Sequence, residues 1–180
     1  MRRPITTLLL GLALCLLAKP ASGQEFITIT LDGTALNWTG AFANSLTPGA
    51  ASNAGNTAVT VTSNWNLAPG RTALILYAYF NSATAALAHS ATLCTTGCPD
   101  IPSSAIEIKV NAGAFTPMTQ TAPFGAAGAS LQIFNLRITG ANKTSNRTDT
   151  LAFNINLSGL PQLPADTYTG TLVLQAQATP

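Results

Sequence analysis

The stretch "LAFNINL", residues 151–157, alternates apolar and polar side chains with a period of two. In an extended chain one face carries the apolar residues Leu151, Phe153, Ile155 and Leu157, and the other carries Asn154 and Asn156. Successive side chains of a β-strand point to opposite faces of its sheet. The stretch therefore predicts a strand with one face on a hydrophobic core.

The same alternation recurs along the chain, in residues 26–31, 57–62, 106–110 and 171–178. Residues 72–80 and 131–139 add apolar runs rich in β-forming residues, and 36–39 is a shorter candidate strand. Asn111-Ala112-Gly113 predicts a short hairpin turn after residue 110. Only the alanine-rich piece 82–91 suggests a turn of helix. The pattern predicts an all-β fold, an antiparallel immunoglobulin-like β-sandwich of about seven to eight strands.

The N-terminus has the features of a secretory signal peptide. Arg2 and Arg3 precede a leucine-rich run, and Ala21-Ser22-Gly23 supplies the small residues that a signal peptidase recognises. The run is shorter than the roughly 20 residues that span a bilayer. We therefore expect residues 1–23 to be removed on export, and residues 24–180 to form a single β-sandwich domain. The predicted location is secreted, periplasmic or on the outer cell surface, with no membrane insertion of the mature chain.

Charge excludes some classes of partner. Without residues 1–23, five basic residues remain against six acidic ones. A chain with so few positive charges lacks the basic surface that nucleic acids or anionic membranes attract. No nucleic-acid partner is expected.

Two cysteines, Cys94 and Cys98, remain after the predicted cleavage, and they enclose a turn that contains Gly97. In an oxidising compartment an even pair is typical of a disulfide. A zinc site needs four ligands, and only His89 lies nearby in sequence. A thioredoxin-type redox site has two residues between its cysteines rather than three. The spacing favours a structural disulfide over a metal or redox site, and no metal or cofactor is predicted.

Nothing in the sequence points to catalysis. His89 is the one histidine, and a hydroxyl such as that of Ser90 beside it is uninformative in so threonine-rich a chain. No Gly-x-Ser-x-Gly nucleophile motif is present. We expect the acids to lie singly on the solvated surface or in turns: Glu25, Asp32, Asp100, Glu107, Asp149 and Asp166. The sequence predicts a protein that is not an enzyme.

Aromatic residues gather in the first half of the chain and are candidates for stacking on sugar rings: Trp38, Trp65, Tyr77 and Tyr79. Tyr77 and Tyr79 share one face of their predicted strand, and Leu74, Leu76, Ala78 and Phe80 share the other. An exposed row of tyrosines would form a platform for a ligand. The alternative is that both faces are covered and that these rings fill the core.

The C-terminal run "LPADTYTGTLVLQAQATP" combines a tight turn, Tyr168, Thr-Gly-Thr and an alternating last strand. It resembles the end of exported bacterial immunoglobulin-like domains, including spore coat U and pilin-like subunits and wall-binding WxL domains. Trp65-Asn66-Leu67 also has the WxL form. The chain departs from that pattern at Leu172-Val173-Leu174, where a second tryptophan motif is missing, and this argues against peptidoglycan binding. The resemblance implies a secreted structural subunit assembled by strand exchange, and no site residues are carried over from it.

Two functional hypotheses follow. The first is a non-catalytic structural or surface-associated subunit, pilin-like, whose partners are itself or other surface subunits. The second is a glycan- or cell-wall-binding module that uses exposed aromatic residues. Residues 26–31 leave little slack for a free donor arm, so we expect them to pair within their own chain and complete the sandwich.

Overall fold

The structure, a computed structural model, describes residues 25–31, 46–55, 58–91 and 94–180. These residues form an all-β fold with ten strands and one short 3-10 turn, η2 (Ser103–Ala105). Within those ranges no helix has the length and hydropathy that a membrane span requires. The predicted fold class is confirmed. The predicted signal peptide, the candidate strand at 36–39 and Asp32 lie outside the described residues.

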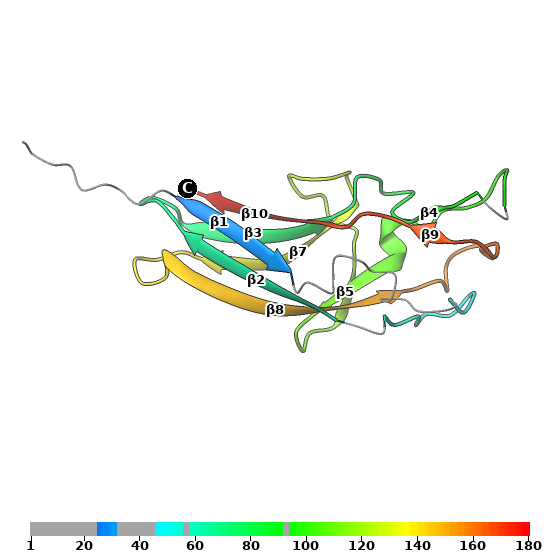
Figure 1. The fold of residues 1–180 in the computed structure, drawn as a ribbon, viewed down its shortest axis with the longest axis horizontal. Helices are drawn as coiled ribbons and strands as arrows, with labels where there is room; N and C mark the ends of the chain where they lie inside the picture. The colour runs from blue at the N-terminus through cyan, green and yellow to red at the C-terminus, as the bar shows by residue number, and fades with distance from the viewer. Residues whose placement is uncertain (1–24, 32–45, 56–57, 92–93) are drawn as a thin grey trace, which may run out of the picture.

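The strands form three antiparallel sheets (Figure 1). The five-stranded sheet runs in the order β1 (Phe26–Leu31), β2 (Val59–Asn66), β8 (Thr144–Ile155), β5 (Ile106–Val110), β6 (Phe115–Pro117). The three-stranded sheet runs in the order β10 (Val173–Thr179), β3 (Ala73–Tyr79), β7 (Ser130–Arg137). A small third sheet pairs β4 (Ala88–His89) with β9 (Tyr168–Thr169).

The core lies between the two larger sheets, which face each other as the layers of a sandwich (Figure 1). Alternate residues of each strand supply it, as the period-two pattern predicts. Strand β2 buries every second side chain along its length. The largest fully buried apolar side chains are Leu74, Leu76, Ile101, Ile108, Met118, Leu151, Phe153, Ile155 and Leu157.

The structure has ten strands among its described residues, whereas seven to eight were predicted. The strands that the prediction missed are very short. Strands β4 and β9 have two residues each, too few to show a period of two. The predicted helical turn at 82–91 is wrong, since this piece contains β4. The hairpin at Asn111-Ala112-Gly113 is confirmed: it joins β5 to β6, and Asn111 has a positive φ of 52°.

Both terminal strands pair within the chain. Strand β1 pairs with β2 along its whole length, which confirms the expectation for residues 26–31. Strand β10 pairs with β3 from Val173 to Thr179. The ends of both strands meet the β2–β3 connection: Glu25 forms an ion pair with Arg71, and Thr72 donates its backbone N–H to the carbonyl oxygen of Thr179 over 2.9 Å. Strands β4 and β9 lie at the opposite pole (Figure 1).

Asp149 contradicts the expectation that the acids are solvated. It lies on the inner face of β8 with 2% of its side chain exposed. Arg147 donates from Nε to Asp149 Oδ2 over 2.7 Å and from Nη2 to Oδ1 over 2.8 Å, and Asn111 donates to Oδ1 over 2.7 Å. Burial raises the pKa of the Asp149 carboxyl, but these hydrogen bonds and the charge of Arg147 outweigh it and leave the pKa lowered.

Candidate functional site

Tyr77 and Tyr79 lie on the outer face of β3, the central strand of the three-stranded sheet. The side chains between and beside them, Leu76 and Ala78, are fully buried in the core, whereas both tyrosines are half-buried. The two faces therefore divide as the alternation predicts. The Tyr79 hydroxyl donates to Gln175 Oε1, on the neighbouring strand β10, over 2.9 Å.

Phe124, from the loop between β6 and β7, completes an aromatic cluster with the two tyrosines. Its ring centroid lies 5.9 Å from that of Tyr77 at an interplanar angle of 71°, an edge-on contact. It lies 6.2 Å from that of Tyr79 at 28°, a stacked contact. Sequence reasoning missed Phe124, because it lies outside any alternating run. The available clue was a lone phenylalanine beside Gly125 in a loop of small residues.

The two tryptophans do not join this cluster. Trp65 lies on the inner face of β2 with 2% of its surface exposed, and its Nε1–H donates to the carbonyl oxygen of Asn142 over 2.8 Å. The proposal of Trp65 as a stacking residue is therefore wrong, because no face of its ring is open to a ligand. It fills the core, as the alternative held. Trp38 lies outside the described residues.

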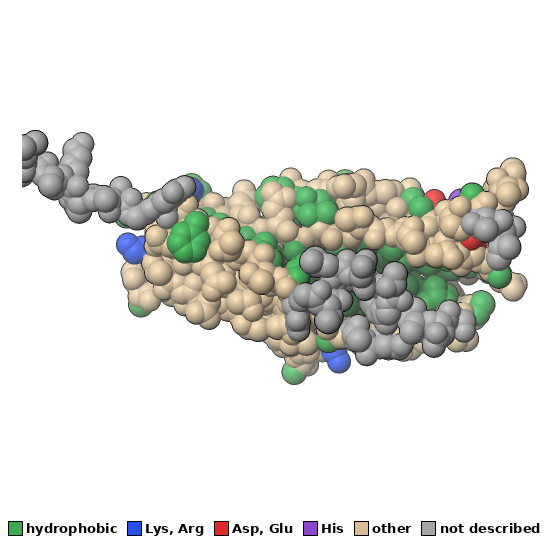
Figure 2. All heavy atoms as spheres, viewed as in Figure 1, with side chains coloured by type: hydrophobic (Ala, Val, Ile, Leu, Met, Phe, Trp, Pro, Cys, Tyr) green, Lys and Arg blue, Asp and Glu red, His purple; other side chains and the backbone are tan. Residues whose placement is uncertain are grey.

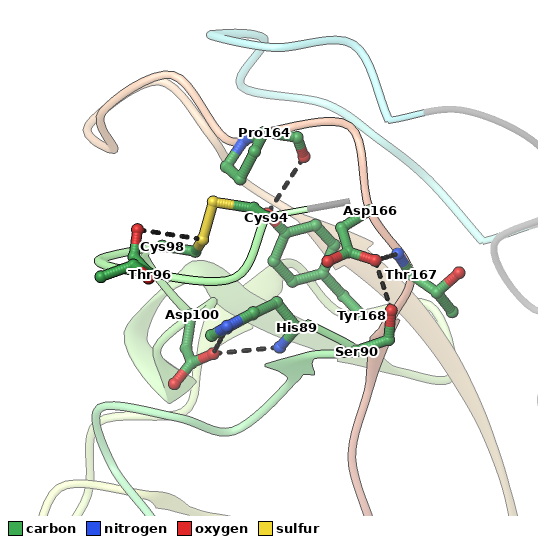
Figure 3. Close-up of a disulfide and its surroundings, with 10 residues drawn as sticks. All are labelled: His89, Ser90, Cys94, Thr96, Cys98, Asp100, Pro164, Asp166, Thr167 and Tyr168. Atoms are coloured by element: carbon green, nitrogen blue, oxygen red, sulfur yellow. Dashed lines mark hydrogen bonds and ion pairs between the residues drawn. A yellow bond between two sulfur atoms is a disulfide. The ribbon is translucent and has the colours of Figure 1, made fainter. Parts of the chain in front are cut away.

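Cys94 and Cys98 form a disulfide at the far pole, with their Cα atoms 6.1 Å apart (Figure 3). Gly97 has a positive φ of 70°, the conformation that the tight turn requires. The disulfide lies in a surface excursion, residues 88–100. Two backbone hydrogen bonds close its base: Leu87 N–H donates to Ile101 O over 3.1 Å, and Ile101 N–H donates to Leu87 O over 2.9 Å. The pairing agrees with the sequence prediction.

His89 and Ser90 lie at the start of this excursion, and their side chains point apart (Figure 3). His89 Nδ1 lies 2.7 Å from Asp100 Oδ1, and the His89 backbone N–H donates to the same oxygen over 3.0 Å. Ser90 donates from its hydroxyl to Asp166 Oδ1. The imidazole and the hydroxyl are thus engaged by two different carboxylates, and this arrangement clamps two loop segments rather than forming a Ser–His–Asp relay.

The pKa shifts at this pole agree with hydrogen bonds that hold the loop segments together. The hydrogen bond from the His89 backbone N–H, and then that from the imidazole, lower the pKa of the Asp100 carboxyl. Burial, followed by the charges of Asp166 and Asp100, raises the pKa of Tyr168, whose hydroxyl donates to the carbonyl oxygen of Pro164 over 3.2 Å. Among the residues that the structure describes, no group of three or more His, Cys, Asp and Glu side chains is placed to hold a metal ion.

The disulfide should contribute modestly to stability. Replacing both cysteines with serine should lower the free energy of unfolding by about 2 kcal/mol, the chain-entropy value for so small a ring. The Leu87–Ile101 pair and the β4–β9 ladder still close the excursion, so the far-ultraviolet circular dichroism should stay unchanged. Urea titration measures the loss. Alkylation of the unreduced mature chain, residues 24–180, should add no mass. Two adducts, or a collapse of the β spectrum in the variant, would contradict the prediction.

No model of a known protein family matches the chain, and no curated protein shows significant similarity to it.

Proposed function

We propose that the chain is a secreted, non-catalytic, surface-associated β-sandwich protein that assembles with copies of itself or other surface subunits through the edge strands β1 and β10. The observation that carries this proposal is the difference between these two edges and the other edges of the two larger sheets. An unpaired strand edge presents free N–H and C=O groups to any second strand, and proteins usually block such edges.

Three strand edges have blocking features. Strand β6 has three residues and includes Pro117, which has no N–H to offer. Strand β7 is irregular, with a register shift opposite Leu76 and Tyr77, and it ends in Arg137. The half of β8 that extends beyond β5 carries the inward-pointing charges of Arg147 and Asp149. Each feature is among the known devices against edge-to-edge pairing.

Strands β1 and β10 have no such feature. Neither contains a charged residue, a proline or a register shift: their sequences are FITITL and VLQAQAT. The two strands lie in contact on the same side of the sandwich (Figure 1). Figure 2 shows this side: uncharged polar atoms and backbone cover most of the described surface, and hydrophobic side chains are visible along the line between the sheets.

The resemblance of the C-terminal strand to pilin-like subunits supports the same role, with one difference in mechanism. Strand exchange needs a terminal strand that leaves its own domain. Here β1 pairs with β2 over six residues and β10 pairs with β3 over seven, all within the same chain. Addition of a strand edge from a second subunit to β1 or β10 needs no such exchange. The signal-peptide interpretation of residues 1–23 supports the external location.

Lysine on either edge should weaken assembly. In size-exclusion chromatography with light scattering, the mature chain should be a folded monomer at low micromolar concentration and associate as the concentration rises. Thr28→Lys on β1 or Gln177→Lys on β10 should weaken that association by about tenfold, because a charged side chain on an edge opposes strand pairing. Thr62→Lys is the matched control, since β2 is paired on both sides.

The control should associate like the wild type. A chain that stays monomeric up to millimolar concentration would contradict the proposal. So would association that neither edge variant weakens.

A further inference from the structure

The outer face of the three-stranded sheet carries an aromatic cluster that edge pairing does not use. We infer that this face, centred on Tyr77 and completed by Tyr79 and Phe124, binds a neutral polysaccharide chain. The inference goes beyond the proposed function, because it concerns a sheet face rather than the sheet edges. It rests on four features of the described residues: the arrangement of rings, the amides beside them, their fixed geometry and the charge around them.

Amide side chains flank the aromatic residues in register. Tyr77 lies between Gln175 of β10 and Gln132 of β7 across the sheet. One row along, Ile75 lies between Gln177 and Asn135. The irregularity in β7 places two consecutive residues inward between these rows, so that the side chains of 132 and 135 are both exposed on the outer face.

The rings are held in place before any ligand arrives. The loop that carries Phe124 is tied to the end of β3 by the Ala126 N–H, which donates to the Phe80 carbonyl oxygen over 3.0 Å, and to β7 by the Ala122 N–H, which donates to Ser130 Oγ over 2.9 Å. Gly125 has a φ of +78° and lies so close to the Tyr79 ring that an added Cβ would be 2.8 Å from its Cγ. A preformed surface loses little conformational entropy on binding.

These features match the chemistry of a sugar chain. A pyranose ring has an apolar C–H face, which packs on an aromatic ring by dispersion, and a rim of hydroxyls, which exchange hydrogen bonds with amides. The Tyr79–Gln175 hydrogen bond uses the amide oxygen and not the Nε2 donor of Gln175. Rings with amides on both sides therefore offer both kinds of contact at once.

The charge around the cluster selects neutral glycans. The charged residue nearest to Tyr77 along the register is Arg137, which lies opposite Ala73. Ala73 and Tyr77 are four positions apart in the strand, about 13 Å. Recognition of an anionic sugar uses arginine or lysine at hydrogen-bonding distance, and an uncharged row of tyrosine, phenylalanine and glutamine side chains provides none.

Retention on polysaccharides tests the inference. Native gels containing hydroxyethylcellulose, xylan or polygalacturonate, and pull-downs with microcrystalline cellulose and chitin, are run at concentrations where the chain is monomeric. At least one neutral probe should retain the chain more strongly than the anionic polygalacturonate does. Tyr77→Ala and Phe124→Ala should each weaken that retention by about tenfold, the effect of one stacked ring. Tyr77→Phe keeps the ring and should bind within about threefold of wild type.

Phe115→Ala is the matched control, because Phe115 is an exposed phenylalanine, at 38%, on the other sheet. It should leave retention unchanged, and circular dichroism verifies the fold of every variant. Lack of retention by all neutral probes would overturn the inference, as would preference for polygalacturonate or retention that survives both alanine variants. The Thr28→Lys variant of β1, which lies on the five-stranded sheet, should bind glycan normally, so failure here is distinct from failure of edge assembly.

Discussion

Replacing Asp149 with alanine should lower the free energy of unfolding by about 3 kcal/mol, because it leaves the guanidinium of Arg147 without its partner. Breaking a buried pair costs about 3–5 kcal/mol, and we place this one at the lower end, since Arg147 keeps 35% of its side chain exposed. Urea denaturation at neutral pH measures the loss. The double variant Arg147→Met, Asp149→Leu should recover most of it, because an apolar pair of similar volume needs no desolvation of charge.

The same carboxylate should make stability depend on pH. Its pKa is lowered in the folded chain, so its contribution is fully present above the unfolded pKa of about 3.9 and is lost as pH falls through the folded pKa. Between pH 5 and pH 2 the wild type should lose more stability than Asp149→Asn does, since asparagine does not titrate. A single alanine variant that costs less than about 1 kcal/mol, or parallel pH profiles, would contradict this account of the pair.

Replacing Gly170 with alanine should have an effect of similar size, for a steric reason. Gly170 follows β9 and lies where the β4–β9 ladder would continue opposite Leu87. An added Cβ would overlap the carbonyl oxygen of Ala86 and lie 2.9 Å from the Leu87 side chain. Overpacking against side chains costs about 1–3 kcal/mol, and we expect about 3 here because backbone moves less readily.

Gly140→Ala is the control, because nothing lies within 4 Å of the Cβ that it would add. It should change stability by less than about 0.5 kcal/mol. Urea titration of both variants gives the comparison, and hydrogen exchange at the backbone amides of β4 and β9 locates the damage. Equal stabilities for the two variants would show that the Ala86 segment moves aside freely.

The strands were predictable because their residues obey a local rule. In β2, β3 and the second half of β8, apolar residues recur at every second position. That period alone is enough to tell which face of each strand is buried. The shared face of Tyr77 and Tyr79 was predicted by the same rule. Strands β4 and β9 were not predicted, because a strand of two residues shows no period. Their pairing also joins segments about 80 positions apart in the sequence.

The candidate site was only partly predictable. Tyr77 was identified from its strand face, but Phe124 reaches it from a loop whose position depends on a positive φ at Gly125 and on hydrogen bonds to distant strands. The expected solvation of Asp149 was wrong, and for Trp65 residue type left two alternatives open, ligand stacking and core filling, of which the structure shows the second. Both are in phase with inward-facing apolar neighbours, Val61 and Leu151, and that phase predicted burial better than the polarity of an acid or the size of an indole.

The meeting of both terminal strands at the β2–β3 connection makes the domain a candidate for circular permutation. Glu25 and the last residues of β10 anchor to the adjacent residues Arg71 and Thr72, so a short flexible linker could join residue 180 to residue 25. New ends could then open in the turn around Gly159, which has free space beside it. In fusions, a cargo attached at residue 25 or residue 180 would lie at the pole of the β2–β3 connection and leave the opposite pole, with the disulfide, exposed to solvent.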